Sequence, residues 1–121
     1  MERFPKMRRK DREASKQKAF EILSSAVYGT LSTFNGDYPY GVPVNYVFCD
    51  DFIYIHSALE GHKLENIKKF PNVCFTVVKY CKVLPDELST AYESVIVFGK
   101  AHIVESEQEK REALEKIGIK Y

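Results

Sequence analysis

The sequence predicts a mainly β protein, a small barrel of antiparallel strands with short helices at its ends. Stretches rich in β-branched and aromatic residues recur along residues 26–104, and polar turns such as Asn35-Gly36 and Cys49-Asp50-Asp51 separate them. The 121 residues, 45% of them hydrophobic, suffice for one core and are too few for two. We therefore expect a single domain over residues 1–121.

The amino-terminal part is expected to be a basic arm followed by a helix. Residues 1–20 hold eight Lys and Arg against three acidic residues, although the whole chain carries a net charge of only +1. The arm spans residues 1–10, and the predicted helix spans 11–24 with Asp11 as its cap. A basic run is typical of nucleic-acid-binding arms. Because no basic stripe accompanies it, a solvated helix start that can reach an anionic ligand is the better interpretation, and no nucleic-acid partner is expected.

The first predicted strand, 26–33, is joined to the second, 38–48, by Asn35-Gly36, a pair that fits a tight turn with positive φ at both central positions. A third strand, 52–56, follows the polar turn, so these strands form an antiparallel meander. The remaining predicted elements are a helix at 61–70, a strand at 73–80, a loop at 82–88, a strand at 92–104 with a bulge or close approach at Gly99, and a capping-box helix at 106–117 that ends at Gly118.

Two prolines interrupt the hydrogen-bond ladder of the strand at 38–48. Pro39 and Pro43 cannot donate a backbone hydrogen bond, which is tolerated at sheet edges and bulges. Either the strand is an edge blunted by proline, or something flat approaches its backbone, and the sequence favours neither interpretation over the other.

The connection between the third strand and the next helix is a candidate anion site. His56 ends the strand, Ser57 lies in the polar turn, and His62 and Lys63 fall in the first turn of the helix. A cation there is disfavoured by the helix dipole by roughly 0.3–1 kcal/mol, unless an anion shares the site and binds the free backbone N–H groups. The two interpretations are a bound phosphate and a solvated Lys and His on an exposed turn.

Several other chemistries have no sequence signal. Cys49, Cys74 and Cys81 form no C-x-x-C pair, which indicates reduced thiols rather than disulfides or a zinc site. The scattered histidines predict no metal site, and no glycine-rich phosphate loop, catalytic carboxylate pair or Ser-His-Asp arrangement is evident. Without a membrane-spanning segment or a hydrophobic secretory signal, a cytoplasmic protein with no membrane partner is expected.

Residues Met7–Arg12, Tyr38–Tyr46, Ile55–Lys63 and Tyr92–Gly99 form four motifs in a characteristic order. Their order and spacing resemble the nitroimidazole-resistance (Nim) branch of the pyridoxamine 5′-phosphate oxidase-like flavoproteins, and the similarity covers nearly all of residues 7–117. The resemblance implies an FMN-binding split β-barrel that works as a homodimer with flavin sites at the subunit interface.

The resemblance also implies roles for particular residues. Ser57, His62 and Lys63 match the positions that hold the FMN phosphate. His56 and Ala58 match the edge of the site between the flavin ring and the ribityl chain. The other matched positions are a strand along the isoalloxazine ring (Val42, Pro43, Val44 and Asn45), a strand that reaches the flavin of the partner subunit (Tyr92 and Ser94), and the basic helix start (Arg9 and Arg12).

The function implied is electron transfer through bound FMN to a small acceptor such as a nitroaromatic or nitroimidazole compound. NADH or NADPH is a candidate electron donor, and His56 is the candidate proton donor. The alternatives are a flavin-binding or redox-sensing module without turnover and a heme-binding relative on the same barrel. Family members usually continue past the last helix into another strand. The carboxy-terminal Arg and His segment with which true pyridoxamine-phosphate oxidases bind substrate has no match here, so that reaction is not implied.

Overall fold

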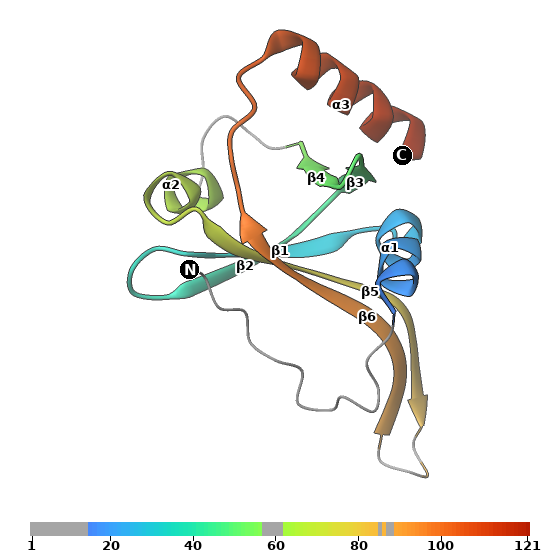
Figure 1. Ribbon diagram of the computed structural model, residues 1–121. Coiled ribbons are helices and arrows are strands. Elements are labelled where there is room, and N and C mark those ends of the chain that lie inside the picture. The colour runs from blue at the N-terminus through green and yellow to red at the C-terminus, as the bar shows by residue number, and fades with distance from the viewer. Residues whose placement is uncertain (1–14, 57–61, 85, 87–88) are drawn as a thin grey trace.

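The computed structural model describes residues 15–56, 62–84, 86 and 89–121, without the side chains of 62–63, 80–84 and 89–92 (Figure 1). Within these residues the chain is mainly β, as predicted. The elements are α1 (Lys16–Ser25), β1 (Gly29–Phe34), β2 (Pro39–Val44), β3 (Tyr46–Cys49), β4 (Phe52–Ile55), α2 (His62–Lys69), β5 (Asn72–Leu84), β6 (Ser89–Lys100) and α3 (Glu107–Lys120).

The strands form two antiparallel sheets. The larger has the order β2-β1-β5-β6, and the smaller pairs β3 with β4. The chain passes from one sheet to the other at Asn45, which lies between β2 and β3 and belongs to neither. The single strand predicted over 38–48, and with it the continuous meander, is therefore wrong. The alternation of apolar residues continues through Asn45, because it depends only on which face each side chain occupies. It gives no sign that the chain changes its pairing partner there.

The tight turn with positive φ lies in a different hairpin from the one predicted. Asp50 and Asp51 have φ angles of 53° and 65°, and they join Cys49 directly to its pairing partner Phe52. Two consecutive left-handed residues match the right-handed twist of the flanking strands. The short β3–β4 hairpin therefore depends on two aspartates that tolerate this conformation.

The turn at Asn35-Gly36 is longer and works differently. It belongs to a four-residue connection between paired Phe34 and Pro39, and in that connection only Gly36 has a positive φ, of 97°. The Asn35 side-chain oxygen accepts hydrogen bonds from the backbone N–H groups of residues 37 and 38, both at 2.8 Å. Asn35 thus supports the hairpin through its side chain rather than through its own φ.

The helix starts follow polar caps. Ser15 caps α1 by accepting from the Lys18 N–H at 3.1 Å, and the predicted cap Asp11 lies outside the described residues. Ser106 caps α3 as predicted, accepting from the Glu109 N–H at 3.3 Å. The predicted end of α3 at Gly118 is wrong because the helix continues to Lys120. A glycine near a helix end weakens the helix by only about 1 kcal/mol, which the contacts of the last turn can offset.

The hairpin of β5 and β6 is longer than predicted, since β5 continues through residues 82–84 of the expected loop and β6 already begins at Ser89 (Figure 1). Its irregularity lies between Val78 and Tyr80, where Lys79 has no partner on β6. Gly99 instead pairs regularly with Val73, and a Cβ added to it would meet no atom within 4 Å, so the bulge or close approach predicted there is wrong.

The core lies between α1 and the two sheets. Its buried members are Ile22, Leu23, Ala26, Leu31, Val44, Tyr46, Phe75 and Val77. Gly29 provides the close approach in this core, because a Cβ there would lie 2.2 Å from the Phe75 ring. Tyr46 is fully buried, packs edge-on against Phe75 at 4.9 Å between ring centroids, and donates its hydroxyl to the Leu23 carbonyl at 2.5 Å.

Candidate functional site

The candidate phosphate site lies at the start of α2. The helix begins at His62 and Lys63 follows, so the backbone places both basic residues in the first turn. The exposed residue His56 directly follows β4. Ser57 and Ala58 lie outside the described residues. The described chain therefore has the predicted order of strand, connection and helix. The first-turn N–H groups of a helix have no partner within the helix, and an anion can bind there.

Among the described strands, β2 forms an outer edge of the larger sheet, because β1 is its only neighbour there. Pro39 pairs opposite Phe34 and Pro43 opposite Thr30, so both prolines lie on an edge strand. This position explains why the missing N–H groups are tolerated. The edge-strand interpretation is confirmed, and the approach of a flat ligand to this strand stays a prediction.

The four residues predicted to lie along a flavin ring divide into two kinds. The Val44 side chain is buried in the core, and the half-buried Val42 packs against it. Pro43 and Asn45 are exposed. A ligand along this strand would therefore contact the Pro43 and Asn45 side chains and the strand backbone, whereas the two valines serve the core.

A buried polar pair seats α2 on the sheet. The Asn66 side-chain amide donates to the Thr33 hydroxyl at 2.9 Å, with Asn66 5% and Thr33 3% exposed. The Thr33 hydroxyl in turn lies 3.5 Å from the Tyr40 carbonyl of β2. At the other end of the helix, Phe70 packs against Phe34 with 5.5 Å between ring centroids. The predicted site did not include Asn66 or Thr33, although Thr33 shares the inward alternation of Leu31.

Tyr92 and Ser94 lie on β6, at the opposite edge of the larger sheet from β2. Pairings across the sheet align Val44 with residues 29, 77 and 95 in one row, so Ser94 is about three strand spacings, or roughly 14 Å, from β2. Ser94 is exposed, and the side chain of Tyr92 is not described. One chain therefore does not bring these two residues together with residues 42–45.

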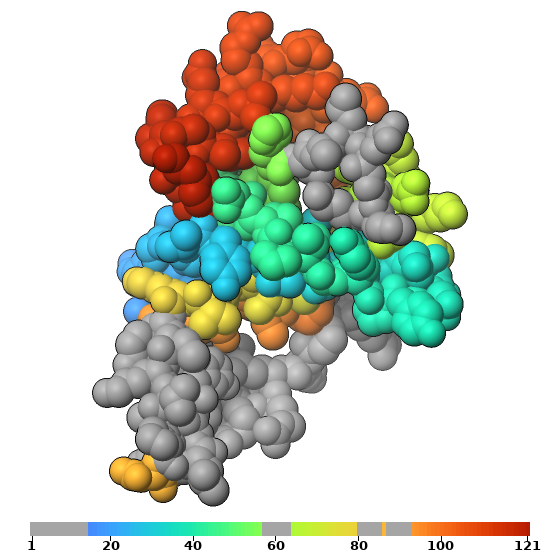
Figure 2. All heavy atoms as spheres, turned by 180° about the vertical axis from the view of Figure 1, so that it is seen from behind, coloured from blue at the N-terminus to red at the C-terminus, as the bar shows by residue number. Residues whose placement is uncertain are grey.

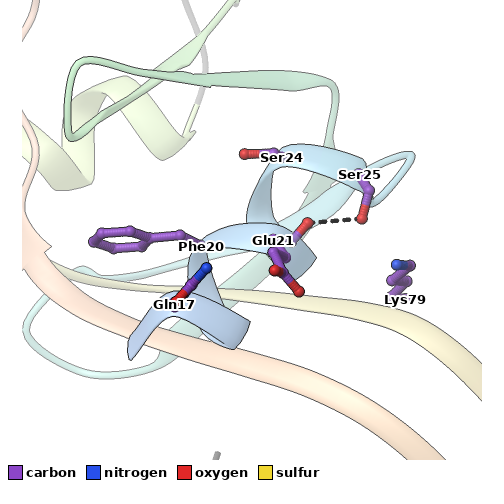
Figure 3. Close-up of a pocket in the computed structure, with 6 residues that line it drawn as sticks. All are labelled: Gln17, Phe20, Glu21, Ser24, Ser25 and Lys79. Carbon is purple, nitrogen blue, oxygen red and sulfur yellow. Dashed lines mark hydrogen bonds between the residues drawn. The ribbon is translucent and has the colours of Figure 1, made fainter. Parts of the chain in front are cut away.

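A shallow groove lies elsewhere, between α1 and β5 (Figure 3). Its lining residues are Gln17, Phe20, Glu21, Ser24 and Ser25 of α1 together with Lys79 of β5. Ser25 turns back to donate its hydroxyl to the Glu21 carbonyl at 2.8 Å. None of the predicted site residues lines this groove; the described ones lie on β2, β6, at Asn45 and His56, and at the start of α2.

In the described part of the chain, no group of three His, Cys, Asp or Glu side chains could hold a metal ion. None of the helices described there is long and apolar enough to cross a membrane.

Residues 15–121 match the family described as pyridoxamine 5′-phosphate oxidase. The chain belongs to this family. The two antiparallel sheets are accordingly those of a pyridoxamine-phosphate-oxidase-like split barrel, and the predicted fold class is confirmed. No curated protein is significantly similar to this member of the family.

The resemblance to the nitroimidazole-resistance branch is also confirmed. A structure of a candidate 5-nitroimidazole antibiotic resistance protein from Bacteroides thetaiotaomicron is 32% identical over 88% of this chain and 66% of that one, with a TM-score of 0.76. The flavocytochrome Anf3 from Azotobacter vinelandii is 17% identical over 88% and 51% of the two chains, with a TM-score of 0.75. An FAD-binding protein from Mesorhizobium loti is 21% identical over 88% and 72%, with a TM-score of 0.71.

The last two similarities show the fold alone, because their identities are below 25%. This family member spans 66% of the Bacteroides protein and 51% of the flavocytochrome, so it covers less than two thirds of either relative.

Proposed function

We propose that this protein binds FMN and passes electrons from the reduced flavin to a small acceptor such as a nitroaromatic or nitroimidazole compound. The observation that carries the proposal is the start of α2, where His62 and Lys63 open a helix directly after the connection from β4. The Lys63 cation in the first turn would be stabilised by a bound dianion, which a flavin phosphate provides, and His62 could donate a further hydrogen bond to it. The Bacteroides relative, a candidate nitroimidazole resistance protein, supports the choice of acceptor.

The residues of this chain would bind, orient and shield the cofactor. Lys63 and the first-turn N–H groups of α2 would hold the phosphate, with Ser57 and His62 as further donors, and Ala58 would lie beside the ribityl chain. Pro43 and Asn45, exposed on the β2 edge, would contact the ring. Bound flavin supplies the hydride and electron chemistry. His56 is exposed at the end of β4 and would hold or deliver a proton at its imidazole.

We also propose that the protein works as a homodimer with flavin at the subunit interface. The outer face of the larger sheet carries Pro43 on β2 and Ser94 on β6. The same face carries Val78 and Ile96, 52% and 57% exposed, beside the half-buried Thr30 and Thr76. Large apolar side chains exposed on a sheet face are typical of interaction surfaces. A second copy covering it would bring Tyr92 and Ser94 toward the flavin of its partner, which one chain alone does not do.

The visible absorption spectrum of the purified protein tests flavin binding. Oxidised flavin is expected to give bands at about 375 and 450 nm. Lys63→Ala should weaken FMN binding by roughly 10- to 100-fold, because it removes a charge-assisted hydrogen bond to the phosphate. Lys68→Ala is the matched control, since Lys68 lies in the last turn of the same helix. A protein that is colourless and takes up no added FMN would refute the proposal, and a Soret band would indicate heme instead.

Turnover needs a separate measurement. Consumption of NADH or NADPH in the presence of a nitro compound is expected for an oxidoreductase, and it should fall in His56→Gln if His56 delivers the proton. A flavin-binding or redox-sensing module without turnover would bind FMN and reoxidise without consuming the nitro compound.

A further inference from the structure

The Asn66–Thr33 pair is unusual among the buried contacts of this protein. The described core consists otherwise of apolar side chains and Tyr46, and the described buried polar residues are these two. Their hydrogen bond, at 2.9 Å, joins positions 33 residues apart in the chain. Burying an amide and a hydroxyl adds little stability over a well-packed apolar pair, but it fixes one relative orientation of the two elements.

The Asn66–Thr33 pair fixes the orientation of α2, whose first turn is the candidate phosphate site. Asn66 follows Lys63 by three residues and His62 by four, so all three lie on one face of α2, one helical turn apart. A rotation or shift of α2 that breaks the contact of Asn66 with β1 would therefore move the first turn as well. Fixing Asn66 fixes the direction in which the start of α2 faces.

The same hydrogen bond reaches the candidate ring-binding strand. Thr33 pairs with Tyr40 of β2, and the Thr33 hydroxyl lies 3.5 Å from the Tyr40 carbonyl. A line of polar contacts thus runs from α2 through Thr33 on β1 to β2. It ties α2, one turn after the helix start, to β2 at Tyr40, three residues before Pro43 on the same strand.

We propose that Asn66 and Thr33 are positioning residues that hold the first turn of α2 in register with β2, and thereby set the preference of the site for a phosphorylated flavin over an unphosphorylated one. This inference rests on the proposed FMN function. A misplacement of about 1 Å can cost a precisely positioned group as much as about 100-fold of its effect on rate. A buried pair that positions the phosphate-binding turn can therefore decide how much the phosphate adds to flavin affinity.

The experiment compares binding of FMN and riboflavin, each followed by the quenching of flavin fluorescence, to the full-length protein. In Thr33→Val, in Asn66→Leu and in the double variant, the ratio of FMN to riboflavin affinity should fall by about tenfold or more, while riboflavin affinity stays nearly unchanged. The double variant leaves neither partner unpaired and should therefore fold even if a single variant does not. Thr33→Ser keeps the hydroxyl and should retain the ratio.

A purely structural role predicts a different result, in which the double variant binds both flavins as the original protein does or loses both in equal proportion. Either result would overturn the inference while leaving FMN binding by the original protein intact. If the original protein binds neither flavin, the proposed function fails, and the positioning role fails with it. If it binds both equally, the phosphate site itself is wrong.

Discussion

α2 and α3 are attached to the same β framework in opposite ways. α2, eight residues long, buries Asn66 against Thr33 and packs Ile67 against the core. α3, fourteen residues long, buries no residue and lies beyond β3 and β4 at one end of the molecule (Figure 1, Figure 2). The shorter helix, which opens with the candidate phosphate site, is thus the one held by buried contacts. A binding group needs this kind of support because its position must be fixed.

The contacts of α3 are made by long polar side chains near its surface. Glu109 accepts from the Tyr54 hydroxyl at 2.8 Å, and Lys116 donates to the Cys49 sulfur at 2.9 Å. At its last turn, Lys120 lies 3.7 Å from the Tyr46 ring centre and donates to the Tyr46 carbonyl at 3.0 Å. Tyr46 is therefore the one buried side chain in these contacts, and Tyr121 adds hydrogen bonds from the end of α3 to the Val27 carbonyl and to the Tyr46 backbone.

Truncating Tyr46 should have the largest effect on this arrangement. Tyr46→Ala removes a fully buried ring packed against Phe75, and we expect it to lower the free energy of unfolding by about 3–5 kcal/mol. Because Lys120 loses its partner ring, α3 should also become more accessible to protease than α2. Urea denaturation and limited proteolysis measure the two effects. Tyr38→Ala, at a tyrosine that is 70% exposed, is the control and should change stability by no more than about 0.5 kcal/mol.

High pH should reduce the stability that buried Tyr46 contributes. Burial, and then the neighbouring Tyr121, raise the pKa of Tyr46 from its usual 10.0 to about 12. The pKa of Tyr46 is higher in the folded state than in the unfolded state. The stability that the neutral, buried Tyr46 contributes is therefore complete below pH 10 and is lost as the pH rises from about 10 to 12. The loss is at most about 3 kcal/mol. Urea midpoints measured from pH 8 to 11 should show the advantage of the original protein over Tyr46→Phe shrinking above pH 10. A constant difference would contradict this assignment.

The buried hydrogen bond that holds α2 on β1 can be tested by a double-mutant cycle. Thr33→Val and Asn66→Leu should each destabilise the protein by about 1–3 kcal/mol, because each leaves a buried polar group without its partner. The double variant should be destabilised by clearly less than the sum, since no unpaired group is left. Additive losses would mean that the two side chains do not depend on each other, and the contrast between the helices would lose its physical basis.

Much of the fold could be predicted because its signals are local. Helix caps such as Ser106, the alternation of the strands and the prolines of β2 all act within a few residues. The failures occurred where the outcome depends on distant partners. Asn45 divides a continuous alternation because the next residues pair with β4 rather than β1, and the close approach lies at Gly29 because the Phe75 ring packs there.

The candidate site divides in the same way. The start of α2 could be predicted, since two basic residues in a first turn after a strand are visible in the sequence. The Asn66–Thr33 contact could not, because either residue alone is typical of a solvated helix or strand surface. Only the packing of α2 on β1 brings them together. Residues that carry charge to a site are thus easier to predict than those that hold it in place.

The polar contacts of α3 should contribute the least to the free energy of unfolding. A second cycle, with Tyr54→Phe and Glu109→Ala, removes an exposed hydrogen bond between β4 and α3. We expect a coupling of no more than about 0.5 kcal/mol, because water can replace either partner and ordering two long side chains offsets much of the gain. Urea denaturation under the conditions used for the Thr33 and Asn66 cycle gives the comparison directly. A coupling as large as that of the buried pair would mean that α3 is held as firmly as α2, and that burial is not what distinguishes the two helices.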